Sequence, residues 1–208
     1  MGESICYHSP MLTADMLLAL LLGYLLGSIP FGLLLTRMTG RGDVRAIGSG
    51  NIGATNVLRT GSKGLAAATL ALDCLKATAA ILLARALFMD GERFAAAGAM
   101  IGHLYPVWLS FRGGKGVATL LGVLIPLLPM AAILYAIVWL GLLFIVRISS
   151  VAGIAAAVSA PVSAALLGAD ALFPMLLGFA LLVIWKHRAN LARLKAGTEP
   201  RVGRNNAR

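Results

Sequence analysis

Residues that could hold a phosphate group gather in one glycine-rich stretch, GSGNIGATNVLRTG, at residues 48 to 61. Glycine permits close backbone approach, so successive N–H groups can point at one anion. Hydroxyl and amide groups add donors, and guanidinium groups match phosphate oxygens. A flexible surface turn has the same composition, so the stretch alone leaves both interpretations open. The candidate binding residues here are Arg45, Gly48, Ser49, Gly50, Asn51, Gly53, Thr55, Asn56 and Arg59.

A second glycine-rich turn, FRGGKGVAT, lies at residues 111 to 119. Lys115 stands between Gly114 and Gly116, with Gly113 before them, where we expect a helix to begin. A lysine beside the open N–H groups of a helix start forms an anion site. The turn is not a P-loop, because glycine follows the lysine where that motif requires Ser or Thr.

Polar residues in two later segments complete the set of candidates. His187 and Asn190 are three residues apart, so both face one side if this segment is helical. Ser149 and Ser150 lie between two apolar segments. Either serine could add a hydroxyl group to the same site or only cap a helix.

Asp73, Lys76 and His103 are ionisable residues that lie deep within apolar segments. We expect Asp73 and Lys76 to form a mutually neutralising pair, because charges in a membrane are usually paired or face a cavity. A substrate role for this pair is the less favoured alternative. His103 precedes the second glycine turn, and we expect a hydrogen-bonded packing residue there rather than a catalytic one.

The composition predicts an integral membrane protein, since 59% of the 208 residues are hydrophobic and 12% are charged. We predict one all-α domain, residues 1–208, a polytopic bundle of about seven spans. Pro30, in GSIPFG, should kink the first span, and Ser28 could satisfy a freed carbonyl. Residues 115–147 are too long for one crossing and form two crossings or a re-entrant hairpin. The predicted spans are residues 14–36, 65–88, 94–111, 117–128, 130–146, 151–167 and 171–185.

Charge predicts the orientation of these spans. Except for Lys76, Arg85 and Arg93, every Lys and Arg falls in segments that seven spans place on one side. Excess Lys and Arg marks the cytoplasmic side, so we expect the N-terminus outside and the C-terminus inside. Contact with anionic lipid explains most of the net charge of +10, and no nucleic-acid partner is needed. Residues 1–13 are expected to be a leader without function, and residues 199–208 a basic tail.

Carboxylates are scarce on the predicted inner side, where only Asp43 and Glu199 occur. Because Mg²⁺ prefers carboxylate oxygens, we expect no metal and no cofactor, and no carboxylate base. Cys6 and Cys74 have neither metal-binding nor redox spacing. The residues therefore predict a pocket for one or two phosphates at a bilayer surface.

Five motifs in order carry a family resemblance: GSIPFG, GSGNIGATNVLR, GHLYPV, FRGGKGVAT and HRANLARL. Over about residues 23 to 199, the chain resembles the bacterial acyl-phosphate:glycerol-3-phosphate acyltransferases. The resemblance implies transfer of a fatty acyl group from acyl phosphate to the 1-hydroxyl of sn-glycerol 3-phosphate. It implies lysophosphatidate and inorganic phosphate as products, in the first step of phospholipid biosynthesis. The implied location is the bacterial cytoplasmic (inner) membrane, with membrane lipid around the protein and the active site on the cytoplasmic face.

The resemblance also implies site residues, with the Ser149/Ser150 register open by one. Ala77 departs from the family, which often has glycine there. A phosphate transporter is one alternative, but it would place binding groups near mid-membrane in both halves. A different lipid enzyme is the other, although no histidine is followed, after four intervening residues, by the aspartate that soluble-type acyltransferases carry at that position. The implied catalytic residues are Ser49, Arg59, Lys115, Ser150, His187 and Asn190.

Overall fold

The computed structural model describes residues 14–203, and the elements within this range are helices joined by turns. Two short 3-10 helices, η1 (Val44–Ala46) and η2 (Val107–Leu109), lie in the connections. The predicted all-α class is therefore confirmed for the part of the chain described. The α-helices are α1 (Ala14–Gly27), α2 (Phe31–Met38), α3 (Ala54–Leu58), α4 (Lys63–Leu87), α5 (Glu92–Leu104), α6 (Val117–Leu127), α7 (Pro129–Val146), α8 (Ser149–Leu166), α9 (Phe173–Lys186) and α10 (Arg188–Lys195).

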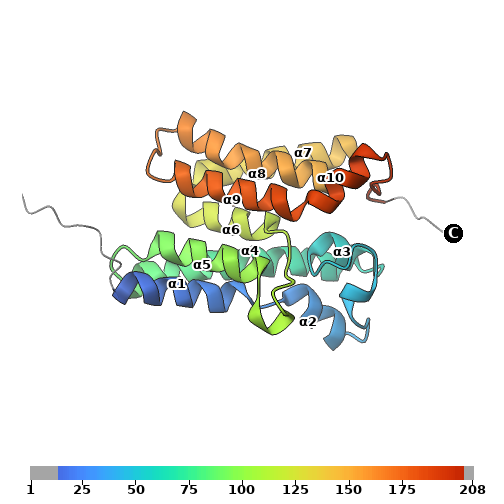
Figure 1. The fold of residues 1–208 in the computed structure, drawn as a ribbon, viewed down its shortest axis with the longest axis horizontal. Helices are drawn as coiled ribbons and strands as arrows, with labels where there is room; N and C mark the ends of the chain where they lie inside the picture. The colour runs from blue at the N-terminus through green and yellow to red at the C-terminus, as the bar shows by residue number, and fades with distance from the viewer. Residues whose placement is uncertain (1–13, 204–208) are drawn as a thin grey trace, which may run out of the picture.

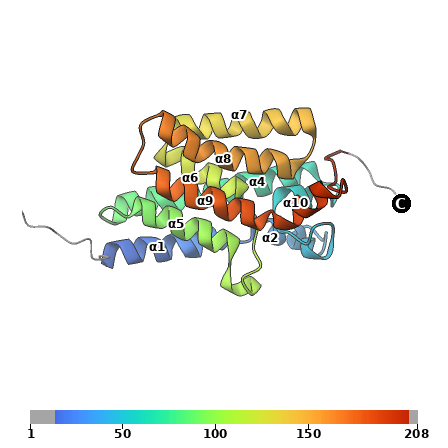
Figure 2. The same cartoon turned by 45° about the horizontal axis from the view of Figure 1, so that its top comes forward.

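The longer helices run along one common axis in an elongated bundle (Figure 1). α1, α4 and α5 form one layer and α7, α8 and α9 another, with α6 between them (Figures 1 and 2). The short helices α2, α3 and α10 gather at the end of the bundle where the described chain finishes. The glycine-rich stretch and the C-terminal segment therefore share one end of the molecule.

Each of the seven predicted spans contains a helix, but the lengths differ. By length and composition, four described segments could cross a membrane: Ala14–Met38, Lys63–Leu87, Pro129–Val146 and Ser149–Leu166. The predicted third span, residues 94–111, was too long, because α5 ends at Leu104. Pro106 lacks an N–H and disfavours helix in the residue before it, so the chain continues as η2 instead.

Residues 115–147 form two helices, α6 and α7, which pack against each other. Leu128 separates them, and Pro129 starts α7, where its missing N–H costs no helical hydrogen bond. α6 has only 11 residues, or about 16 Å at the helical rise, so it is much shorter than α4.

Glycine residues let α1 and α5 pack with their backbones nearly in contact. A Cβ atom at Gly23 would lie 2.1 Å from the carbonyl oxygen of Ala95, and one at Gly98 would lie 2.1 Å from that of Leu20. Apolar lipid gives helices little reason to associate, so such close packing is a main source of helix–helix stability in a membrane.

The first apolar segment is broken as predicted, with α1 ending at Gly27 and α2 starting after Pro30. The hydroxyl of Ser28 donates to the carbonyl of Leu25, and the indole N–H of Trp108 donates to the carbonyl of Ser28. Side chains thus satisfy carbonyl groups around the break, as backbone in a membrane requires.

A second, smaller core lies beneath the glycine-rich stretch. Leu33 of α2, Val44, Ile52, Val57 and Ala66 of α4 are buried together there. Because the stretch folds over its own core, the structure does not support a flexible surface turn.

Candidate active site

The amide of Asn56 organises the glycine-rich stretch from within. Its Nδ2 donates to the carbonyl oxygens of Val44, Ile47 and Asn51 at 2.7, 3.1 and 2.8 Å. Its Oδ1 accepts from the backbone N–H of Ser49 at 3.1 Å, and the Ser49 hydroxyl lies 3.4 Å away. The donors and the acceptor of this buried amide are therefore all used within the stretch. We assign Asn56 to shaping the stretch rather than to contact with substrate.

The backbone N–H groups of the stretch are less available than the sequence indicates. The N–H of Gly50 donates to Ile47, and that of Gly53 donates at 2.8 Å to Oδ1 of Asn51. These bonds hold the chain through the turn that enters α3. Thr55, on α3, is exposed.

Arg59 supplies the free positive charge of the stretch. A Cβ atom at Gly48 would lie 2.3 Å from Nη1 of Arg59, so glycine lets the guanidinium lie directly over the backbone. Within residues 14–203, the guanidinium group of Arg59 has no hydrogen-bond or ion-pair partner, although its backbone N–H donates to the carbonyl of Asn56. Arg45, by contrast, is paired with Asp43 through Nε and Nη2 at 2.9 and 2.6 Å. Of the two predicted arginines, Arg59 is thus the one available to an anion.

The second glycine turn places Lys115 against α10. Nζ of Lys115 donates to Oδ1 of Asn190 at 2.6 Å, which leaves two of its three N–H donors for other partners. Gly116 precedes α6 with φ +86°, a left-handed conformation that favours glycine. The N–H groups of Gly113 and Gly114 are used by the carbonyls of Leu104 and His103. These two glycines therefore serve close packing, not the expected row of open N–H groups.

Glu199 lies at the centre of the site, although the sequence indicated only a tail position for it. Its Oε1 accepts from the hydroxyl of Ser150 at 2.7 Å and from Nδ2 of Asn190, and its Oε2 accepts from Nε of Arg193 at 2.7 Å. The side chain is only 5% exposed. The only signal in the sequence was that Glu199 is a rare carboxylate on the basic side. Of the two candidate serines, Ser150 makes this contact.

His187 ends α9 and is buried. Its Nδ1 lies 2.7 Å from the carbonyl oxygen of Val183. A carbonyl can only accept, so Nδ1 carries the proton and Nε2 keeps a lone pair. Burial lowers the pKa of His187 to about 4, with the nearby charge of Lys115 acting in the same direction. His187 is therefore neutral near pH 7.

Electrostatics around the site favour an anion. Burial lowers the pKa of Lys115 to about 8, with Arg193, Arg59 and Lys186 adding to the effect and Glu199 opposing it. Partial burial acts to raise the pKa of Glu199, but hydrogen bonds from Asn190, Ser150 and Arg193 outweigh it and lower that pKa. Near pH 7 the site holds one carboxylate among several cations.

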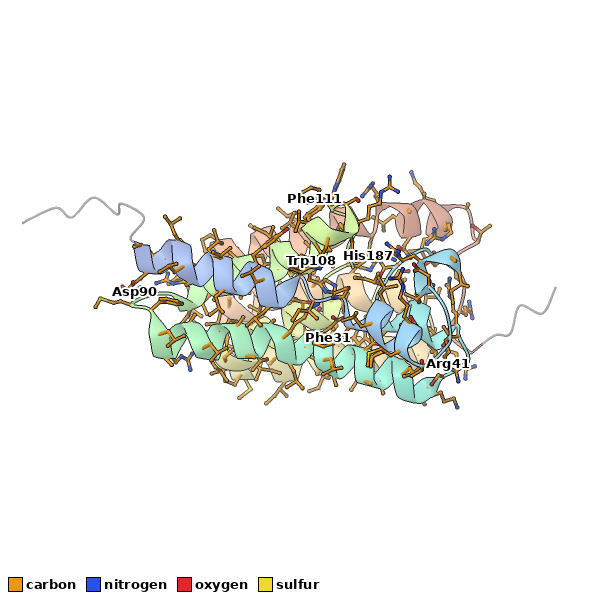
Figure 3. The ribbon with its side chains drawn as sticks, turned by 90° about the horizontal axis from the view of Figure 1, so that it is seen from below. Phe31, Arg41, Asp90, Trp108, Phe111 and His187 are labelled. Atoms are coloured by element: carbon orange, nitrogen blue, oxygen red, sulfur yellow. The ribbon has the colours of Figure 1, made fainter. Side chains whose placement is uncertain are left out.

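The structure gathers the predicted catalytic residues in one region. Lys115, Asn190, Glu199 and Ser150 form a continuous chain of hydrogen bonds, and Arg59 is close enough to affect the pKa of Lys115. His187 lies at the same end of the bundle as Arg41 and well away from Asp90 (Figure 3). Among residues 14–203 no group of His, Cys, Asp and Glu side chains has the arrangement of a metal site.

A family model described as glycerol-3-phosphate acyltransferase matches residues 17–197. A Mesorhizobium japonicum protein named glycerol-3-phosphate acyltransferase is 56% identical over 192 residues, covering 92% of this chain and 98% of that protein. An Agrobacterium fabrum protein of the same name is 55% identical over 194 residues, covering 92% and 95%. This chain belongs to the glycerol-3-phosphate acyltransferase family. It is therefore an acyltransferase, as the motif order predicted.

Solved structures agree with this assignment. The crystal structure of PlsY, an integral membrane glycerol 3-phosphate acyltransferase, in its glycerol 3-phosphate form, has a TM-score of 0.85 and 38% identity. It covers 91% of this chain and 96% of its own. The lysophosphatidic acid form of that protein has a TM-score of 0.83 and 37% identity. The fold of this chain is thus that of an integral membrane acyltransferase.

Proposed function

We propose that this acyltransferase uses acyl phosphate as its donor and acylates the 1-hydroxyl of sn-glycerol 3-phosphate. The hydroxyl oxygen attacks the acyl carbonyl carbon, the bond from that carbon to the phosphate oxygen breaks, and inorganic phosphate leaves. The other product is 1-acyl-glycerol 3-phosphate. Acyl phosphate is a mixed anhydride and is already activated, so the enzyme needs no covalent intermediate, metal or cofactor.

The hydrogen-bond chain of Lys115, Asn190, Glu199 and Ser150, next to the free guanidinium of Arg59, carries this proposal. Both substrates are phosphates that repel each other, so the enzyme must neutralise charge before they can approach. Free N–H donors on Lys115 and Arg59 meet that need and stabilise the charge that builds up on the leaving phosphate. Aligning two reactants contributes an effective molarity of roughly 10⁵–10⁸ M.

The two phosphates occupy separate parts of this region in our proposal. One binds at the glycine-rich stretch, where Ser49 and Arg59 are exposed. The other binds near Lys115, His187 and Asn190. Arg45, Asn51, Thr55 and Asn56 contribute by shaping or lining the first part, and the glycines of both turns allow close approach.

The proton of the attacking hydroxyl passes to a phosphate oxygen of the substrate. His187 keeps a lone pair on Nε2, but with a pKa of about 4 it is a weak base. A phosphate monoester dianion has a conjugate-acid pKa of about 6 and is the stronger base. His187 then acts as a neutral hydrogen-bond partner.

We place the chain in the bacterial inner membrane with seven crossings and the site on the cytoplasmic face. α1 begins at one end of the bundle and the described chain finishes at the other, as an odd number of passes requires (Figure 1). α5, α6 and α9 all have an end at the site and are short, about 16 to 21 Å at the helical rise. Short helices let the polar turns sit at the lipid interface, where the acyl chain can stay in the bilayer.

The test is an assay of purified protein with acyl phosphate and glycerol 3-phosphate, without coenzyme A or metal. We expect equimolar release of phosphate and 1-acyl-glycerol 3-phosphate, and Lys115→Ala should reduce turnover below detection. Near wild-type activity in that variant would refute the role of Lys115. Uptake of glycerol 3-phosphate into proteoliposomes without acyl transfer would favour the transporter alternative.

A further inference from the structure

The ammonium group of Lys76, inside the bundle, has no donor left for a substrate. Its Nζ donates to the carbonyl of Ile29 at 2.8 Å and to Oδ1 of Asp73 at 2.7 Å, and lies 3.0 Å from Nδ1 of His103. Lys76 and Asp73 are buried, with side chains 2% and 4% exposed. Three N–H donors thus meet three acceptors. The predicted ion pair is confirmed, and it includes a histidine and the backbone at the break between α1 and α2.

The orientation of the His103 ring follows from this contact. A lysine ammonium can only donate, so Nδ1 of His103 is the acceptor and the proton is on Nε2. His103 is 4% exposed, and the Nε2 edge of its ring faces the second glycine turn. A Cβ atom at Gly114 would lie 2.0 Å from Nε2. The His103 carbonyl also accepts from the N–H of Gly114 at 3.0 Å.

We infer that His103, held by Lys76 and Asp73, is the positioning residue that sets where Lys115 stands in the site. His103 contacts Gly114 with both its ring and its carbonyl group, and Lys115 is the next residue along the chain. Lys76 of this cluster also donates to the carbonyl of Ile29. The cluster therefore connects the break between α1 and α2 to the turn that carries Lys115. Its effect on catalysis passes through Lys115 and rests on the role proposed above for that residue.

Two substitutions test this contact from its two sides. His103→Asn keeps an acceptor near the place of Nδ1, so Lys76 stays paired, but it removes the ring beneath Gly114. Gly114→Ala keeps the ring and adds a methyl group that collides with it. Each should lower kcat/KM by roughly 10- to 100-fold, the cost of misplacing a group by about 1 Å. The melting temperature of His103→Asn in detergent should stay close to that of the wild type.

The double variant, His103→Asn with Gly114→Ala, tests whether the two substitutions act through the same contact. If both changes act through one contact, the losses do not multiply, and the double variant is no slower than the slower single variant. Losses that multiply, or wild-type kcat/KM in His103→Asn, would overturn the inference. Gly141→Ala in α7 is the control, since a Cβ there meets nothing within 4 Å, and it should retain full activity.

A second route leaves His103 in place and covers the case that His103→Asn does not accumulate. Asp73→Asn combined with Lys76→Met removes both charges together, so no unpaired charge is left buried. Nδ1 of His103 then loses its donor, and kcat/KM should fall although the melting temperature holds. Full activity in this variant would contradict the inference. Failure of the proposed function is a separate result, because the wild type itself would then release no phosphate from acyl phosphate.

Discussion

At the scale of residues, the site is built around a carboxylate rather than around open backbone donors. Glu199 accepts hydrogen bonds from Ser150, Asn190 and Arg193, and Asn190 in turn accepts from Lys115. A buried carboxylate with several donors is stable only while those donors remain. Glu199 therefore holds the side chains that flank the proposed phosphate positions.

Glu199→Ala removes this acceptor from three donors at once. We expect a loss of about 2–3 kcal/mol in the free energy of unfolding, because buried donors are left unpaired, and a lower kcat/KM. Thermal unfolding in detergent and the phosphate-release assay measure the two effects. Glu92→Gln is the control, since Glu92 pairs with Arg85 in an exposed ion pair, and such pairs contribute little to stability. Unchanged stability and activity in Glu199→Ala would show that the carboxylate is not needed to position Ser150, Asn190 and Arg193.

The pKa of Lys115 predicts the alkaline limit of activity. With a pKa of about 8, Lys115 is charged below that pH and loses its proton above it. The rate should therefore fall as pH rises through about 8, whereas His187, with a pKa of about 4, stays neutral throughout. Lys115→Arg keeps its charge at high pH, so any residual activity should lack this decline. A rate that stays flat to pH 10 in the wild type would count against a charged Lys115.

At the scale of elements, glycine residues have different structural roles at different positions. On α1 and α5 it permits backbone contact, and in the second turn it makes room for His103 and lets the chain turn into α6. At Gly48 it admits the guanidinium of Arg59. A glycine-dense segment is thus a poor guide to anion binding by itself, because close packing and a left-handed turn need the same residue.

Gly98→Val tests the packing of α1 on α5. Any Cβ at Gly98 meets the backbone of Leu20, so α1 must move outward, at a cost of about 1–3 kcal/mol. We expect a lower melting temperature in detergent and a smaller amount of folded protein in the membrane. Gly178→Ala in α9, where nothing lies within 4 Å, should leave both unchanged. An equally stable Gly98→Val protein would mean that the two helices need not touch.

At the scale of the whole molecule, most of the basic residues and the proposed catalytic residues share one end of the bundle. Arg41 and His187 lie toward that end, and Asp90 lies at the other (Figure 3). In the orientation proposed above, the cations that satisfy the positive-inside rule also surround the proposed site. Substrate phosphates and anionic lipid headgroups are therefore drawn to one surface.

Cysteine labelling tests this orientation. In a chain with Cys6 and Cys74 replaced by serine and alanine, we expect Asp90→Cys to react with a membrane-impermeant maleimide added outside intact cells. Ala196→Cys, just after α10, should react only after the membrane is opened. The reverse pattern would place the active site on the outer face.

The amino-acid sequence by itself determined the membrane class, the helical segments, the family and most of the candidate residues. These follow from local information: apolar runs, prolines, and short motifs in a given order. It also predicted the Asp73–Lys76 pair, since the two residues are one helical turn apart.

Only the tertiary structure decided how these residues meet. Ser150 and Glu199 are 49 residues apart, and Lys115 and Asn190 are 75 apart, so no local spacing indicates either contact. The inward role of Asn56 and the fit of His103 under Gly114 likewise depend on how separate segments pack. The physical reason is that a polar side chain in this bundle takes whichever partner the packing of the helices brings within hydrogen-bond distance.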